Sequence, residues 1–162
     1  DGSIMLRQVS DEIDFVRKYL ELQELRFKDR LKWKIEVDEN ADLRRLIPKM
    51  TIQIFAENSV RHGIESRIEG GRIEIFAVRD NGNIVLKIRD NGIGRKASRL
   101  NYTGRTGSGI KTISRIFEFT NRINREKAKI DITDLYEKNG NAIGTEVLIT
   151  IPDDYSFEPD AG

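Results

Sequence analysis

The chain has 162 residues, of which 38% are hydrophobic and 34% are charged, with 28 Lys and Arg against 27 Asp and Glu. This length is typical of one globular domain, and the balanced charge gives no electrostatic reason to expect nucleic acid as a partner. The absence of cysteine excludes disulfides, thiolate zinc sites and cysteine nucleophiles. No apolar run approaches the roughly 18 residues of a membrane-spanning helix. The polar start, Asp1 to Ser3, resembles the remnant of an expression tag rather than a signal peptide.

The first predicted element is a long helix over residues 10 to 29. Ser10 is a candidate N-cap, and Asp11 and Glu12 fall in the first turn, where the helix dipole favours acidic side chains. Apolar residues recur at helical spacing and form one stripe: Ile13, Val16, Leu20 and Phe27. This helix either packs on the core of its own domain or continues from a preceding element as a connector.

Alternating apolar and charged residues next predict a strand over residues 33–37. Pro48 is expected to open a second helix, which runs to about residue 62 and stops at Gly63. A hairpin over residues 73–88 follows, because two alternating segments flank an Asn81-Gly82 turn.

A glycine- and arginine-rich segment from residue 92 onwards is expected to be a loop that leads to a third helix near Gly107. Strands around residues 128–135 and 145–151 close the domain, and the acidic tail after Asp153 is expected to be flexible. Strands that come in consecutive pairs predict an α+β fold rather than a doubly wound one. We expect a two-layer α/β sandwich with a mixed, mostly antiparallel sheet covered on one face by helices.

Three polar segments are candidate sites. The first lies on the second predicted helix, where Glu57, Asn58 and Arg61 share one sector of the helix and apolar residues lie opposite. Taken alone, this sector is also compatible with an ordinary solvated helix face.

The second segment is Asp90-Asn91-Gly92-Ile93-Gly94. An earlier copy of its first three letters, Asp80-Asn81-Gly82, lies between two strands and is explained as a hairpin turn. The later copy ends a strand and leads into a loop, and its two glycines let the backbone approach a bound group closely because they lack Cβ. In such a turn the aspartate could accept a hydrogen bond from an exocyclic amine.

The third segment, Gly104 to Gly109, runs directly into the third helix. The free N–H groups and positive dipole end of a helix N-terminus can hold a phosphate. No Gly-Lys-Ser/Thr follows, which excludes a Walker loop, and no strand precedes the segment as in the dinucleotide fingerprint.

Together and in this order, the three segments resemble the N, G1 and G2 boxes of the GHKL ATPase superfamily, which includes histidine kinases, type II topoisomerases, Hsp90 chaperones and MutL repair proteins. Gly144 to Val147 resembles the G3 box. Within the superfamily, the chain is most similar to LytS/YehU-type sensor histidine kinases. Their signature is matched by Tyr19-Leu20, Arg26-Phe27, Pro48, Glu57-Asn58 and His62-Gly63.

The resemblance implies a Bergerat fold that binds ATP and Mg²⁺ between two helices, under a lid formed by residues 95–106. It also implies that Asp90 accepts a hydrogen bond from the adenine amino group and that Thr145 supports Asp90. Asn58 would supply an amide oxygen to Mg²⁺. The other residues implied to bind the nucleotide are Arg61, His62, Gly92, Ile93, Gly94, Gly107, Ser108, Gly109 and Ile110.

Ile54 departs from the family pattern. Conventional kinases carry an asparagine four residues before the Mg²⁺ ligand, and the hydrolytic members carry their general-base glutamate there. The missing base argues against a gyrase- or Hsp90-like hydrolase. Glu57 is the remaining candidate for a base or polarising group, so Glu57 and Asn58 are the expected catalytic residues.

His62 is the only histidine of the chain and belongs to the segment expected to line the pocket. An imidazole built into the pocket is poorly placed for in-line attack, so we expect the chain to bind ATP without phosphorylating itself. The phosphoacceptor would lie in a dimerisation domain that precedes residue 10 in a homodimeric parent protein. By family analogy, this domain is cytoplasmic, the parent is anchored in the bacterial inner membrane, and a response regulator is the downstream partner.

The expected division of the chain is a tag remnant or linker over residues 1–9, a connecting helix over 10–30, the ATP-binding domain over 31–152 and a flexible tail over 153–162. Two alternatives stay open. One is a degenerate nucleotide-binding module that regulates or acts as a scaffold, favoured by Ile54 and the short lid. The other is an anti-sigma-type serine kinase, which would lack the Tyr-Leu and Arg-Phe signature of the first helix.

Overall fold

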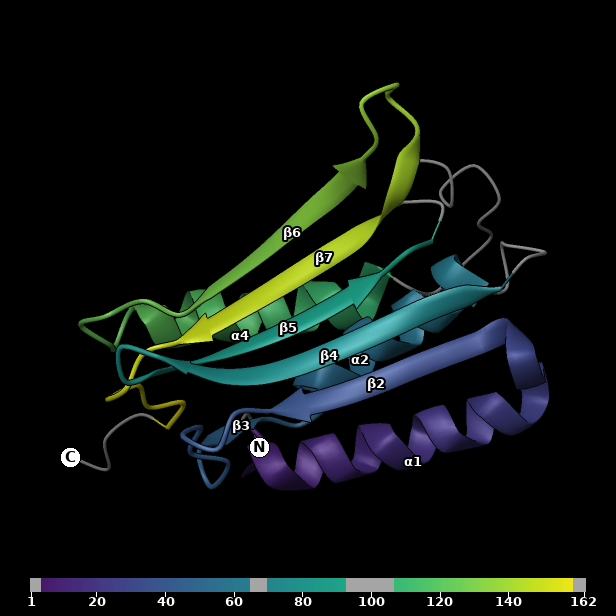
Figure 1. Cartoon of the computed structure of the whole chain (residues 1–162). Coiled ribbons are helices and arrows are strands. Elements are labelled where there is room, and N and C mark those ends of the chain that lie inside the picture. The colour runs from purple at the N-terminus through teal and green to yellow at the C-terminus, as the bar shows by residue number, and fades with distance from the viewer. Residues whose placement is uncertain (1–3, 65–69, 93–106, 159–162) are drawn as a thin grey trace.

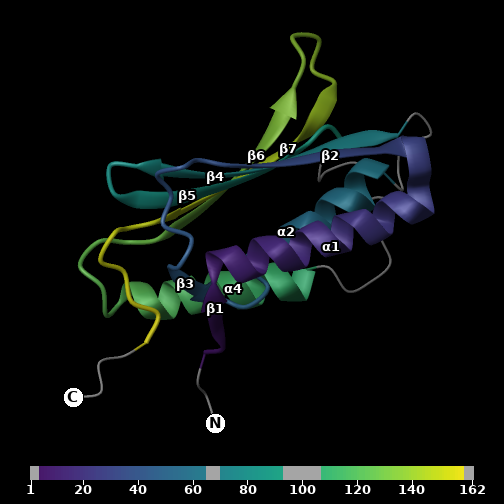
Figure 2. The same cartoon turned by 60° about the horizontal axis from the view of Figure 1, so that its bottom comes forward.

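The computed structural model describes residues 4–64, 70–92 and 107–158. They form a five-stranded sheet with three helices on one of its faces, and Figure 2 shows this helix layer from the side. The predicted two-layer α+β sandwich is confirmed. The helices are α1 (Val9–Phe27), α2 (Thr51–Ser59) and α4 (Gly107–Asn121), and the strands are β2 (Leu31–Val37), β4 (Gly71–Asp80), β5 (Asn83–Asp90), β6 (Lys129–Tyr136) and β7 (Ala142–Ile151).

The sheet is mixed and mostly antiparallel, with the strand order β2-β4-β5-β7-β6 (Figure 1). The pair β2–β4 is parallel, and the pairs β4–β5, β5–β7 and β6–β7 are antiparallel. Asn81 and Gly82 join β4 to β5 with φ values of 51° and 83°, the two positive values that a type I′ hairpin turn requires. The predicted Asn-Gly hairpin is therefore confirmed.

The hydrophobic core lies between the sheet and the helices. Alternate residues of β4 are buried against the helix layer because successive side chains of a strand point to opposite faces. The largest fully buried side chains are Leu20, Leu31, Ile47, Ile52, Ile73, Ile75, Leu86, Ile88, Ile113, Ile149 and Ile151. In the described part of the chain, no helix is both long and apolar enough to cross a membrane.

A second, two-stranded sheet was not predicted. In it, β1 (Leu6–Gln8) pairs antiparallel with β3 (Leu46–Pro48), just before the starts of α1 and α2. Pro48 therefore ends a strand, and the prediction that it opens the second helix is wrong. Helix α2 begins at Thr51, after Met50 in the left-handed region with a φ of 72°. The fixed φ of proline suits the end of an edge strand as well as the first turn of a helix, so proline alone did not distinguish them.

The start of α1 also differs from the prediction. Gln8 occupies the N-cap position and no side chain caps the helix, so Ser10 lies inside α1. Its hydroxyl donates a hydrogen bond to Gln8 Oε1 at 3.3 Å. The N–H groups of Val9 and Ser10 donate to the carbonyl oxygens of Arg45 and Leu43, each at 2.9 Å, so the first turn has acceptors without a serine cap.

Glu12 of α1 caps the neighbouring helix α2. Its carboxylate is fully buried, and Oε2 accepts a hydrogen bond from the N–H of Ile52 at 2.9 Å. The other oxygen, Oε1, lies 3.3 Å from Arg7 Nε in an ion pair that lacks the alignment of a hydrogen bond. Helix α2 has no side-chain cap of its own, and the N–H groups of a first helical turn need an acceptor. Glu12 thus joins α1 to α2.

Residues 154–158 pack on the helix layer, contrary to the flexible tail expected there, and residues 159–162 lie outside the described residues. Phe157 is only 3% exposed, and its ring centroid lies 5.5 Å from Phe117 of α4 and 4.9 Å from Tyr155. The Tyr155 hydroxyl donates a hydrogen bond to Asn121 Oδ1 at 2.6 Å. Burial of the two aromatic rings holds this segment in place despite its acidic residues.

We predict that Glu12→Gln lowers the free energy of unfolding by about 2–3 kcal/mol, because it breaks a buried ion pair and weakens the cap of α2. Urea denaturation measures the change. Glu21→Gln, at an exposed position of the same helix, is the matched control and should change it by less than about 0.5 kcal/mol. Equal effects of the two substitutions would contradict the proposed cap.

Candidate functional site

Segments that are far apart in the sequence meet at the end of β5. Asp90, the last residue of β5, lies opposite Thr145 of β7 in the antiparallel ladder. Gly92 follows β5 and lies against His62 and Gly63, which come after α2. Gly109, in the first turn of α4, lies against Ile54 of α2. The four predicted boxes are therefore brought together on the helix-covered side of the sheet.

Hydrogen bonds from two different segments hold the carboxylate of Asp90, which is buried. The Ser59 hydroxyl donates to Oδ2 at 3.0 Å, and the N–H of Gly92 donates to Oδ1 at 2.9 Å. One donor comes from α2 and the other from the segment after β5. These bonds hold the carboxylate plane of Asp90, the residue predicted from the sequence to accept a hydrogen bond, in a defined orientation.

Thr145 carries a buried hydroxyl, and Oγ1 has no hydrogen-bond partner among the described residues. A buried hydroxyl without a partner destabilises the folded state by about 1–3 kcal/mol. Its place beside Asp90 in the ladder makes this atom available to a polar ligand or an ordered water. The role in supporting Asp90 that the resemblance implied for Thr145 stays a prediction, because Oγ1 makes no hydrogen bond to Asp90 here.

Two glycines are required by close backbone contacts around Asp90. A Cβ on Gly144, whose φ is 147°, would overlap the carbonyl oxygen of Asp90. A Cβ on Gly92 would come within 2.8 Å of Gly63 Cα and of the His62 carbonyl oxygen. Side chains at either position would displace the segments that surround the carboxylate.

A π-helical turn, Val60–Ile64, extends α2. The N–H of Val60 is shared between the carbonyl oxygens of Ala56 and Glu57, as is common at the end of an α-helix. π-Helical turns are frequent at functional sites. Arg61 and His62 are half-buried within this turn. Burial lowers the pKa of His62 below its ordinary value, and the guanidinium of Arg61 lowers it further.

The side of α2 that carries Ile54 faces α4. A Cβ on Gly109 would meet the Ile54 side chain at 3.3 Å, so the isoleucine fills the place where conventional kinases have an amide. Asn58, which is half-buried, follows Ile54 by one helical turn and so lies on the same face. Glu57 lies about 100° around the helix and accepts a hydrogen bond from Gln53 Nε2 at 2.9 Å. Glu57 and Asn58 therefore lie at the two edges of the helix sector predicted from the sequence, with Asn58 on the side of Ile54.

The remaining predicted residues are placed only in part. Gly107 and Ser108 begin α4, and Ile110 packs against the core from its first turn. Ile93, Gly94 and the expected lid, residues 95–106, lie outside the described residues.

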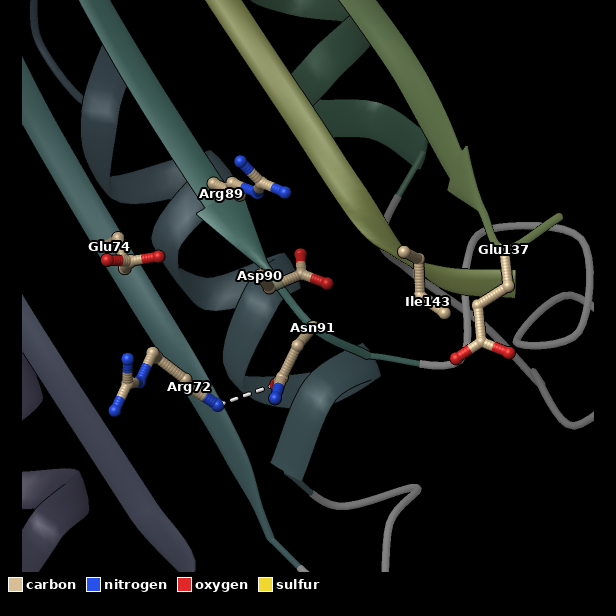
Figure 3. Close-up of a pocket in the computed structure, with 7 residues that line it drawn as sticks. All are labelled: Arg72, Glu74, Arg89, Asp90, Asn91, Glu137 and Ile143. Carbon is tan, nitrogen blue, oxygen red and sulfur yellow. Dashed lines mark hydrogen bonds between the residues drawn. The ribbon is translucent and has the colours of Figure 1, made fainter. Parts of the chain in front are cut away.

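A cavity of about 520 Å³ lies on the uncovered face of the sheet near the end of β5 (Figure 3). It is lined by Arg72, Glu74, Arg89, Asp90, Asn91, Glu137 and Ile143. Along β4, Arg72 and Glu74 alternate with the buried Ile73 and Ile75, so this cavity is on the side opposite the helices. Asp90 also lines this cavity, which therefore adjoins the site assembled by α2, the end of β5 and α4.

Comparison with known proteins connects this geometry to one group of enzymes. The chain is 33% identical over 144 residues to the sensor histidine kinase YesM of Bacillus subtilis, covering 89% of this chain and 23% of that protein. It is 32% identical over 112 residues to the sensor protein LytS of Staphylococcus haemolyticus, covering 64% of this chain and 19% of that protein. The chain is a relative of the LytS- and YesM-type sensor histidine kinases. It spans less than a quarter of the length of these relatives.

The fold agrees with this relationship. The catalytic domain of the histidine kinase ThkA matches with a TM-score of 0.58 and 16% identity, covering 95% of this chain and 99% of that structure. No family model matches the chain. The fold is that of histidine kinase catalytic domains. Together with the sequence relatives, it confirms the resemblance to sensor histidine kinases of the GHKL type.

Sequence reasoning missed two side chains of the site. Ser59 bonds to Asp90, and the buried Gln53 bonds to Glu57. Both lie beside recognised motif residues on α2. Their partners could not be inferred from spacing, because Ser59 and Asp90 are 31 residues apart.

We predict that Gly92→Ala lowers the free energy of unfolding by about 1–3 kcal/mol, since its Cβ would collide with backbone atoms. Gly63→Ala is the matched control: its Cβ would make ordinary contacts of 3.8 Å with Asp90 Cβ and 3.9 Å with Gly92 Cα. We expect this control to change stability by less than about 1 kcal/mol. Thermal unfolding compares the two, and equal losses would contradict the close contact at Gly92.

We predict that His62 makes the fold less stable in acid. Its pKa is lowered in the folded state, so the unfolded chain takes up the proton first as the pH falls through about 6.5. Relative to His62→Gln, the wild type should lose stability between about pH 7 and pH 5. Because this is the only histidine, its imidazole resonance can be followed directly by NMR. A midpoint at or above the ordinary value would contradict the prediction.

Proposed function

We propose that this chain is the ATP-binding catalytic domain of a sensor histidine kinase, which transfers the γ-phosphoryl group of ATP to a histidine on a separate domain. The arrangement of Asp90 and Thr145 carries the proposal: a fixed carboxylate lies beside a buried hydroxyl without a partner. An amino group that donates and a ring nitrogen that accepts would match these two side chains, and adenine has both. Gly92 and Gly144 support it, because the backbone around the carboxylate leaves no room for larger residues.

The proposed roles are those that the family resemblance implies, and the positions of the described residues support them. Asp90 and Thr145 would bind the base, with Gly92, Ile93 and Gly94 close to it. The start of α4, from Gly107 to Ile110, would hold the phosphates with its N–H groups, and Arg61 and His62 would face them. Asn58 would supply an amide oxygen to Mg²⁺, a hard cation that prefers oxygen ligands. When bound, ATP would supply the phosphoryl group, and Mg²⁺ would neutralise the negative charge of the phosphates.

The surroundings of Ile54 favour a kinase over a hydrolase. An apolar side chain packed on Gly109 offers no group to activate water at that place. Phosphoryl transfer depends mostly on positioning and charge neutralisation, so a kinase needs less base catalysis. Glu57, oriented by Gln53, would polarise the reacting group.

The proposal places the phosphoacceptor histidine outside this chain. His62 is the only histidine and lies within the π-helical turn that packs on Gly92. A dimerisation domain of a homodimeric, membrane-anchored parent would supply the acceptor, connected through residues 10–30, and a response regulator would take the phosphoryl group. The ATP-binding domain itself would span residues 31–152, with α1 and the segment around Phe157 packed onto it.

Calorimetric titration of ATP and of GTP, each with Mg²⁺, tests the binding site. We expect the chain to bind ATP and not GTP, because the Asp90 carboxylate accepts from an amino group and would repel the carbonyl oxygen of guanine. Asp90→Asn should weaken ATP binding by at least about 10-fold, since a hydrogen bond to a charged group is lost. Asp80→Asn, in the similar motif at the β4–β5 hairpin, is the control and should leave the affinity unchanged. No binding of any adenine nucleotide would refute the proposal.

A second experiment separates an active kinase from a degenerate nucleotide-binding module. The chain is incubated with γ-labelled ATP, alone and with a dimerisation domain from a LytS- or YesM-type kinase. We expect label on the added domain and none on this chain. ATP binding without any transfer would favour the regulatory or scaffold alternative, and label on a serine would favour the serine-kinase alternative.

A further inference from the structure

Ser59 is the side chain that holds Asp90 from the helix layer. It is 4% exposed, and its hydroxyl donates to Asp90 Oδ2 at 3.0 Å. We propose that Ser59 is a positioning residue that orients the Asp90 carboxylate for the amino group of a 6-aminopurine. This inference rests on the proposed nucleotide binding and adds the residue that makes it selective for the base.

The two donors to Asp90 are not equivalent. The N–H of Gly92 is only two residues away in the chain, so it moves together with the strand end that carries the carboxylate. The Ser59 hydroxyl belongs to α2 and therefore fixes the carboxylate relative to a different element. The terminal torsion of an aspartate is broad and roughly two-fold. Without the Ser59 hydroxyl, the carboxylate would lose this hydrogen bond to α2, and its direction towards the base would be less well defined.

The position of Ser59 also links the two ends of the proposed nucleotide site. It directly follows Asn58, the proposed Mg²⁺ ligand, on α2. The bond from Ser59 to Asp90 fixes this end of α2 against the end of β5. This bond therefore fixes the distance between Asn58, proposed to bind Mg²⁺, and Asp90, proposed to bind the base. Loss of the hydroxyl should affect recognition of the base first, because Ser59 bonds to Asp90 directly.

The test compares two nucleotides that differ in one group. ATP and purine riboside triphosphate share the ribose and the phosphates, but the second lacks the 6-amino group. Both are titrated with Mg²⁺ into the wild type and into Ser59→Ala. We expect Ser59→Ala to weaken ATP binding by about 10-fold, the scale of one hydrogen bond to a charged group, and to change binding of the analogue by less than about twofold. The preference for the amino-bearing base should therefore nearly disappear.

Thr51→Val is the matched control. Thr51 is a fully buried hydroxyl residue of the same helix, and it bonds to the carbonyl oxygen of Pro48, far from Asp90 along α2. This variant should lose stability while keeping the ratio of the two affinities. If Ser59→Ala does not fold, Ser59→Cys keeps nearly the same volume with a much poorer donor, and the same loss of preference is expected.

A double-mutant cycle with Asp90→Asn completes the test. If Ser59 acts through Asp90, Ser59→Ala should weaken ATP binding by less than about twofold in the Asp90→Asn background, because the two effects are not additive. Equal weakening of both nucleotides by Ser59→Ala, or an unchanged ratio, would overturn this inference and leave the proposed function standing. A wild type that binds neither nucleotide would overturn both.

Discussion

The position of helix α2 depends on two carboxylates that come from other elements. Glu12 of α1 accepts from the N–H of Ile52 at its start, and Asp90 of β5 accepts from the Ser59 hydroxyl at its end. A helix of nine residues is too short to be stable by itself, so these bonds and the burial of its apolar face must hold it. Because α2 carries Glu57 and Asn58, the geometry of the candidate site depends on both carboxylates.

The same region contains two of the buried polar side-chain atoms that lack a hydrogen-bond partner among the described residues. Thr145 Oγ1 and Gln53 Oε1 are two of the four such atoms found among the described residues. Thr145 lies beside Asp90, and Gln53 bonds to Glu57 through its other amide atom. Unpaired polar groups destabilise a fold, and proteins keep them mainly where function requires them. Their concentration at the end of β5 and along α2 agrees with a ligand site on the helix-covered side of the sheet.

Ile54 shows how this chain departs from conventional kinases without losing the fold. An apolar contact with Gly109 joins α2 to the start of α4, where the family pattern has an amide. This contact sets the distance between the helix that carries Asn58 and the helix proposed to hold the phosphates. Packing thus supports the positioning that phosphoryl transfer requires.

Local periodicity was sufficient to predict α1, the β4–β5 hairpin, α4 and the last two strands, because each buries one regular face. The motif residues Asp90, Gly92 and Thr145 were also identified from the sequence, and the fold brings them together. Pro48, Ser10 and the segment after Asp153 were interpreted wrongly, since each has a local preference that more than one structure satisfies. Only the tertiary structure revealed that Glu12 caps another helix and that Ser59 holds Asp90. Such pairs depend on how α1, α2 and β5 pack against one another, and no local pattern of residues encodes that packing.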